Sequence, residues 1–178
     1  MAIAHAILVS LIERPASGYD LGKRFESSVG FFWKATHQQI YRELTKLEEQ
    51  GWISAEVIAQ ESRPDKKLYS VTELGKQQLI DWMVQPGEPT PIKDDLLVKI
   101  FAGYLAPKKT ILEELQRHHQ RHQEQLKTYQ DIEQRYFQSP QSLPQPDKFR
   151  YLTLRKGIGY ERDWMTWCDE AIELLKAE

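Results

Sequence analysis

Residues 36–51, which read THQQIYRELTKLEEQG, contain the pattern that decides the fold of the first half of the chain. Thr36 and Gln39 have the spacing of a capping box, in which two side chains accept backbone N–H groups at a helix start. Glycine is the residue that most often follows a helix end, and Gly51 stands at that position. Between these signals, apolar side chains recur at helical spacing at Ile40, Leu44 and Leu47. The stretch therefore predicts an amphipathic helix with one buried and one outward face.

Two more helices are predicted before this one. Residues 2–13 carry apolar side chains at helical spacing, and Pro15 follows them as a stop signal. Ser17 and Asp20 form a second capping box, which begins a helix with an apolar face at Leu21, Phe25 and Val29.

A β-hairpin and a fourth helix are predicted after Gly51. Residues 52–60 and 67–71 are rich in β-branched and aromatic side chains, and the sequence Arg63-Pro64-Asp65-Lys66 between them suits a type I turn. A helix then begins at Thr72 and carries Leu74, Leu79, Trp82 and Met83. Three helices, a hairpin and another helix are the order of a winged helix-turn-helix. We therefore expect a mainly α protein with such a domain over residues 1–85.

The rest of the chain is predicted to be a separate, all-helical domain. Residues 85–91 read QPGEPTP, which cannot continue a helix, so we expect a proline-rich linker at 86–91. Helical patterns then cover residues 94–105, 107–137 and 147–176 of a domain spanning 92–178. The last helix has two adjacent apolar stripes, which two other helices could hardly cover. We infer a homodimer held by C-terminal residues, namely Leu115, His119, His122, Leu126, Tyr129, Leu154, Ile158, Met165 and Ile172.

Composition excludes several classes of protein. The 178 residues carry a formal net charge of -2, which gives no global sign of a nucleic-acid binder. A single cysteine excludes an intrachain disulfide and a cysteine-rich zinc site, and no apolar run is long enough to span a membrane. No catalytic motif or phosphate loop is recognisable, so we expect a protein that is not an enzyme and needs no cofactor. The low cysteine content and the lack of a membrane-spanning run predict a cytoplasmic location.

Local charge and side-chain chemistry nevertheless point to DNA. The outward face of the helix after Thr36 presents Gln38, Arg42 and Thr45, which can bond base edges in the major groove. Cations exceed carboxylates there and again in the hairpin segment 62–67. The alternative is an ordinary solvated face. The full set of predicted DNA-binding residues is Lys34, Thr36, His37, Gln38, Gln39, Tyr41, Arg42, Thr45, Lys46, Arg63, Lys66 and Lys67.

These segments resemble the PadR family of bacterial transcriptional regulators. The matching pieces are Ser17-Gly18-Tyr19-Asp20-Leu21, Gln39-Ile40-Tyr41 and Lys67-Leu68-Tyr69-Ser70-Val71-Thr72. The resemblance implies a homodimer whose winged helices bind two half-sites of a double-stranded operator, usually as a repressor. Family members often have proline directly after the tyrosine, whereas this chain has Arg42, so Arg42 is a candidate specificity residue.

The resemblance also implies a small aromatic or hydrophobic effector. Trp33, Trp164 and Trp167 are the candidate pocket residues, with a role in the core as the alternative. His118 and His122 have a spacing that can bind metal. We favour the interpretation that the histidines of this cluster are polar residues that set the helix register in a dimer, so no metal is expected. Cys168 is expected to be an inert core thiol.

Two hypotheses about function follow from the sequence. The first is a homodimeric, ligand-responsive repressor that binds DNA. The alternative is a winged-helix module that dimerises through its C-terminal helices and binds another protein and no DNA.

Overall fold

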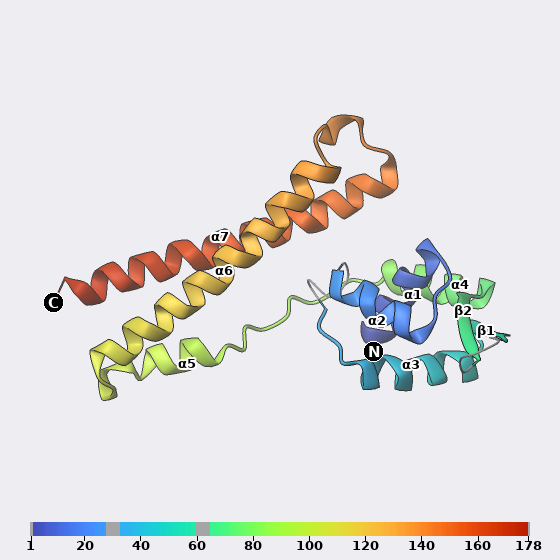
Figure 1. Cartoon of the computed structure of the whole chain (residues 1–178), viewed down its shortest axis with the longest axis horizontal. Helices are drawn as coiled ribbons and strands as arrows, with labels where there is room; N and C mark the ends of the chain where they lie inside the picture. Colours follow the sequence, from blue (N-terminus) through green and yellow to red (C-terminus); the bar gives the residue numbers. More distant parts are fainter. Residues whose placement is uncertain (1, 28–32, 60–64, 178) are drawn as a thin grey trace. The chain divides into compact units, whose positions relative to one another are not determined.

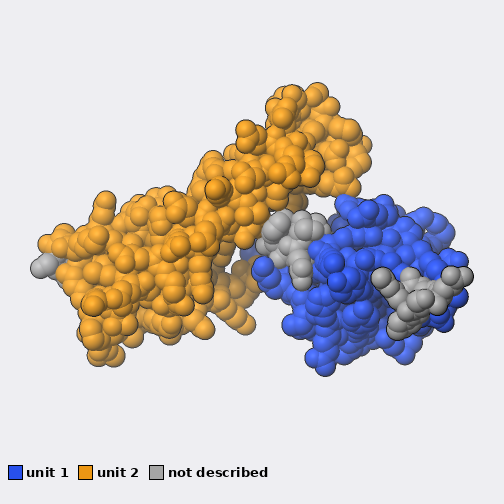
Figure 2. All heavy atoms as spheres, in the orientation of Figure 1, with its two compact units in different colours: residues 1–89 blue, residues 90–178 orange. Residues whose placement is uncertain are grey.

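The computed structural model describes residues 2–27, 33–59 and 65–177, which form two compact units, Met1–Pro89 and Thr90–Glu178 (Figures 1 and 2). None of the helices in these ranges is long and apolar enough to cross a membrane.

The first unit is a winged helix-turn-helix, as predicted. Its helices α1 (Ala2–Glu13), α2 (Gly18–Ser27) and α3 (His37–Glu49) precede two antiparallel strands, β1 (Ile53–Ile58) and β2 (Lys66–Val71), and helix α4 (Glu73–Met83) closes the unit. The strands pair in the register Ile53 with Val71. The turn predicted at 63–66 and the apolar residue Val29 fall wholly or partly outside the described residues.

The signals at Thr36, Gly51 and Thr72 act as the sequence predicts, whereas the Asp20 carboxylate accepts the Ser17 hydroxyl at 2.8 Å in place of the Ser17 N–H that a capping box would give it. At the start of α3, the Thr36 side chain accepts the Gln39 N–H, and the Gln39 side chain accepts the Thr36 N–H at 2.9 Å. Gly51 has a φ of 72°, a left-handed conformation that costs glycine little. The Thr72 hydroxyl caps α4 by accepting the Gly75 N–H at 3.0 Å.

The core of the first unit lies between the three N-terminal helices and the hairpin. Its largest fully buried side chains are Ile7, Leu8, Leu21, Ile40, Leu44, Leu47 and Ile53. Trp52 packs against this core only partly, and Trp82 is 44 % exposed and stacks on His5. Trp82 is exposed because it lies in the last turn of α4.

The second unit is a long helical hairpin with a short helix before it. Helix α5 (Asp95–Phe101) and the 3₁₀ turn η2 (Gly103–Leu105) divide the segment predicted as one helix. The 29-residue α6 (Lys108–Tyr136) and the 32-residue α7 (Gln145–Lys176) then lie side by side, joined by a loop that contains η3 (Pro140–Ser142) (Figure 1).

The hairpin itself covers most of the seam that the sequence assigned to a partner subunit. Leu115, Leu126, Tyr129 and Ile158 are buried, and His119 and His122 bond Asp169 and Glu161 of the same chain at 3.3 and 2.5 Å. Leu154, Met165 and Ile172 are half-buried. Helices α6 and α7 cover the buried side chains of this set within the chain, and a contact of the set with a partner stays a prediction. Cys168 is also buried, which raises the pKa of its thiol.

Two glycines of α7 give a matched test of this packing. A Cβ on Gly157 would lie 3.0 Å from the Tyr129 ring, whereas a Cβ on Gly159 would meet nothing within 4 Å. Alanine favours a helix over glycine by about 1 kcal/mol, so we expect Gly159→Ala to stabilise the unit by up to that amount. The Gly157→Ala variant should be about 1 kcal/mol less stable than the Gly159→Ala variant, because the Tyr129 ring must move to make room for the new methyl group. Thermal denaturation of both variants measures the difference, and equal midpoints would contradict it.

Candidate nucleic-acid interface

The outward face of α3 presents polar side chains that can reach another molecule. Ile40, Leu44 and Leu47 point inward, and the opposite side of the helix exposes Gln38, Tyr41, Arg42, Thr45 and Lys46. The Thr45 hydroxyl donates to the Tyr41 carbonyl at 3.2 Å and can still accept a hydrogen bond. The face therefore offers donors and acceptors suited to base edges.

Arg42 differs from the other cations of this unit. Within residues 2–27, 33–59 and 65–177 its guanidinium makes no hydrogen bond or ion pair, and its side chain is exposed. Lys46, one turn later, lies 3.7 Å from the Glu43 carboxylate. Arg42 therefore keeps its full donor fork available to a ligand.

Aromatic rings of α3 pack into two glycine positions of α2. A Cβ on Gly18 would lie 2.5 Å from the Tyr41 ring, and a Cβ on Gly22 would overlap the His37 ring. Both rings thus fix the angle between α2 and α3. Thr36 and Gln39 likewise act at the start of α3, where they cap each other. Of the predicted DNA-binding residues, these four hold the helix in place, although Tyr41 stays 48 % exposed.

The hairpin lysines have partners that the sequence did not indicate. Lys66 lies 2.7 Å from the Asp20 carboxylate, and Lys67 lies 3.4 Å from Glu48. Carboxylates of α2 and α3 thus engage both lysines, and their role in holding phosphates stays a prediction. Arg63, predicted beside them, lies outside the described residues.

Arg24, another cation of the first unit, has a structural role. Its guanidinium donates to the carbonyls of Ser10, Arg14 and Pro15 at 2.8 to 3.1 Å. Cations at a helix C-terminus satisfy carbonyls that have no partner within the helix. Arg24 therefore stabilises the end of α1, which leaves Lys34, Arg42 and Lys46 as the candidate DNA contacts.

The Asp20–Lys66 pair should give a pH-dependent contribution to stability. Hydrogen bonds from Lys66 and then from Ser17 lower the pKa of Asp20 below its ordinary value. A lowered folded-state pKa gives stability that is present above the unfolded value of about 3.9 and is lost as pH falls through the folded value. We expect the stability gap between wild type and Asp20→Asn to be constant from neutral pH to about pH 5 and to narrow as pH falls below the unfolded value of about 3.9. Urea denaturation across this range measures it, and a gap that widens in acid would contradict the assignment.

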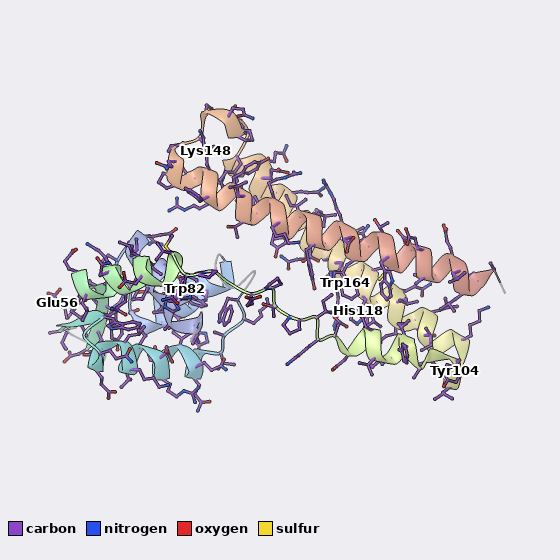
Figure 3. The ribbon with its side chains drawn as sticks, turned by 180° about the vertical axis from the view of Figure 1, so that it is seen from behind. Glu56, Trp82, Tyr104, His118, Lys148 and Trp164 are labelled. Carbon is purple, nitrogen blue, oxygen red and sulfur yellow. The ribbon has the colours of Figure 1, made fainter. Side chains whose placement is uncertain are left out.

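The tryptophans proposed as effector residues lie in two different units. In the first unit, Trp33 lines a cavity of about 90 Å³ with Gly22, Phe25, Lys34, Ala35, His37 and Ile40. In the second, the Trp164 ring stacks on His122 at 5.1 Å and meets Trp167 edge-on at 5.3 Å. Figure 3 shows Trp164 and His118 within the helical hairpin. Within the described residues, no three His, Cys, Asp or Glu side chains are grouped as metal ligands.

Sequence reasoning missed the partners of the lysines and an exposed apolar surface. The sequence analysis placed Lys66 in a turn, whereas β2 begins at Lys66, so that Lys66 and Lys67 point to opposite faces of the strand. The α5 surface, which we define as Val98, Phe101, Tyr104 and Leu105, is 71 to 90 % exposed. The α5 helix was predicted as apolar, but its short length gave no sign of which side would be buried.

Comparisons with known proteins cover the whole chain. The profile of the transcriptional regulator PadR-like family matches residues 7–81, and the one described as virulence activator alpha C-term matches 92–176. A probable transcriptional regulator of Mycobacterium tuberculosis is 38 % identical over 99 % of this chain and 98 % of its own. The negative transcriptional regulator PadR of Bacillus subtilis is 30 % identical over 97 % of each chain.

Solved structures agree over nearly the full length. Bacillus subtilis PadR in complex with operator DNA gives a TM-score of 0.85 at 28 % identity, covering 98 % of this chain and 99 % of that one. The Vibrio cholerae virulence activator AphA gives 0.79 at 33 % identity, covering 98 % of both chains. Bacillus subtilis PadR in complex with p-coumaric acid gives 0.78 at 28 % identity and covers 99 % of both.

Proposed function

Because this chain belongs to the PadR-like family of transcriptional regulators, a family of regulators and not of enzymes, we propose that it represses genes by binding operator DNA through α3. The observation that carries the proposal is Arg42, an exposed guanidinium without a partner in the described residues, at the centre of the outward face of α3. The operator complex of a relative that matches the whole chain supports the same use of the fold.

The division of roles follows from the contacts. Gln38, Arg42 and Thr45 read base edges, because their side chains are exposed on the outward face of α3. Lys34 and Lys46 bind phosphates, which orient the protein without reading sequence. His37 and Tyr41 hold α3 against α2, and Thr36 and Gln39 cap its first turn.

Selection of genomic fragments bound by the full chain tests DNA binding. We expect a small set of fragments that share a two-part site, with affinity that falls steeply as salt rises because phosphate contacts release counterions. Fragments without a common site, or a response to salt that is flat, would favour the protein-interaction module. A reporter behind a selected fragment then separates repression from activation, since deletion of the regulator should raise expression.

We propose a homodimer formed through the second unit, with the α5 surface as the contact. Four large apolar side chains lie on one short segment and are 71 to 90 % exposed. Such exposure is uncommon in a monomeric protein. A second copy would cover them and bring two α3 helices to two half-sites. Because its side chains are exposed, we propose this surface as the contact ahead of the buried residues of the hairpin seam.

Phe101→Asp should convert the dimer to a monomer, because a carboxylate would be buried against apolar side chains. Sedimentation at micromolar concentration measures the change, and DNA affinity should fall with it. Lys108→Asp, an exposed charge change at the start of α6, is the matched control and should leave the dimer intact. A Phe101→Asp protein that stays dimeric would place the contact elsewhere.

We propose that a small aromatic molecule releases the protein from DNA. The support is the complex of Bacillus subtilis PadR with p-coumaric acid. Trp33, Trp164 and Trp167 are the candidate residues, since each ring has a surface that a planar ligand could contact. Titration with p-coumaric acid should quench tryptophan fluorescence and free bound DNA over the same range. Trp33→Phe and Trp164→Phe identify which unit holds the ligand, and DNA that stays bound throughout would refute release by this compound.

A further inference from the structure

Two consecutive lysines at the start of β2 connect the hairpin to two different helices. The Lys66 ammonium lies 2.7 Å from Asp20 Oδ2 of α2, and the Lys67 ammonium lies 3.4 Å from a carboxylate oxygen of Glu48 in α3. Because successive strand residues point to opposite faces, the two lysines hold the strand from both sides. The shorter of the two contacts, that of Lys66, is the better formed ion pair.

The Lys66 contact is part of a larger network at the start of α2. Asp20 Oδ2 also accepts the Ser17 hydroxyl at 2.8 Å, and Ser17 Oγ accepts the Asp20 N–H at 3.2 Å. Next to Ser17, Ala16 exchanges two backbone hydrogen bonds with Tyr69 of β2, at 2.9 and 3.1 Å. The strand is therefore attached at two points, to the first turn of α2 through side chains and to Ala16 before it through the backbone.

This arrangement bears on how the wing, defined here as the strands β1 and β2, meets DNA. A lysine that binds a phosphate must present its ammonium outward, but Lys66 has its ammonium on a carboxylate and only 38 % of its side chain exposed. The charge of Asp20 also opposes a phosphate at that position. Lys66 is thus better placed to fix the wing than to bind DNA directly.

We propose that Lys66 is a positioning residue, which with Asp20 and Ser17 fixes the wing against α2 at the angle needed for operator binding and does not itself bind a phosphate. The inference rests on the proposed DNA-binding function. A positioning role and a phosphate contact of Lys66 predict opposite changes in DNA affinity when the Asp20 carboxylate is removed. If Lys66 positions the wing, removal of that carboxylate weakens binding. If Asp20 only neutralised a DNA-binding lysine, its removal would tighten binding.

The test compares Asp20→Asn, Lys66→Met and the double variant on a fragment selected by the wild-type chain. We expect each single variant to weaken binding about fivefold, the size of one well-formed surface ion pair, and the double variant to be no weaker than either. Lys66→Arg should restore most of the affinity, because a guanidinium keeps the bond to Asp20. Lys46→Met is the control for a phosphate contact and should add its own loss to that of Asp20→Asn.

Three results would overturn the proposal: tighter binding by Asp20→Asn, unchanged binding by both single variants, or additive losses in the double variant. Amide exchange of Tyr69 in the free protein gives an independent measurement. Exchange should be faster in Asp20→Asn and in Lys66→Met, and unchanged in Lys46→Met. If the wild-type chain binds no duplex at all, the proposed function fails, whereas wild-type binding with any of the three results above rejects the role of Lys66 alone.

Discussion

Arg42→Ala is expected to reduce affinity for the selected operator by about 1–3 kcal/mol and to leave binding to random duplex nearly unchanged. The guanidinium is exposed and has no partner in the described residues, so no bond within the chain must break before it reaches a base. A bidentate contact from arginine to guanine is the commonest specific contact in the major groove and is worth about 1–3 kcal/mol of discrimination. The loss should therefore appear in the ratio of specific to random binding, measured by titration at one fixed salt concentration.

Matched variants separate base reading from charge. Arg42→Lys keeps the charge but loses the planar fork, so it should bind random duplex like the wild type while losing discrimination. Lys46→Ala should weaken both kinds of binding alike and lower the salt dependence by about one phosphate. If Arg42→Ala and Lys46→Ala reduce both kinds of binding equally, Arg42 contacts a phosphate and the base-reading role is wrong.

Gly75→Ala is expected to destabilise the first unit by about 3 kcal/mol, because the new methyl group would overlap backbone atoms. A Cβ on Gly75 would lie 2.8 Å from the Trp52 carbonyl carbon and overlap its oxygen. The same oxygen accepts hydrogen bonds from the N–H and the hydroxyl of Thr72, so it cannot move away without breaking them. The first turn of α4 would have to separate from the hairpin.

Urea denaturation followed by far-UV circular dichroism measures this loss, and DNA binding should fall as the unit unfolds. Gly87→Ala is the control, since a Cβ there would meet nothing within 4 Å and stability should stay within about 0.5 kcal/mol of wild type. A Gly75→Ala protein as stable as the control would show that α4 can shift at little cost.

The order of elements was predictable because its signals are local. The two bounds of α1, the capping box of α3 and the left-handed Gly51 each depend on residues a few positions apart. Hairpin pairing follows from the alternation of side chains and agreed with the prediction. These local preferences all favour the same fold, which is why sequence reasoning reached it.

The contacts between elements were not predictable in the same way. Lys66 and Asp20 are 46 residues apart, and only the folded unit brings them together. An apolar seam on a helix indicates that something covers it but not which helix does, so the buried residues of α6 and α7 were assigned to a partner subunit. The outward face of α3, by contrast, was accessible to sequence analysis because the positions of Ile40, Leu44 and Leu47 fix its opposite side.

The fit of His37 and Tyr41 into Gly22 and Gly18 has a consequence for engineering. Because these two rings join α3 to α2, the remaining outward positions of α3 can change without disturbing the angle between the helices. A library randomised at Gln38, Arg42 and Thr45, with the two aromatic residues and both glycines kept, should yield folded proteins with new operator preferences. In such a library the α2–α3 pair keeps its geometry, and only the three residues proposed to contact bases change.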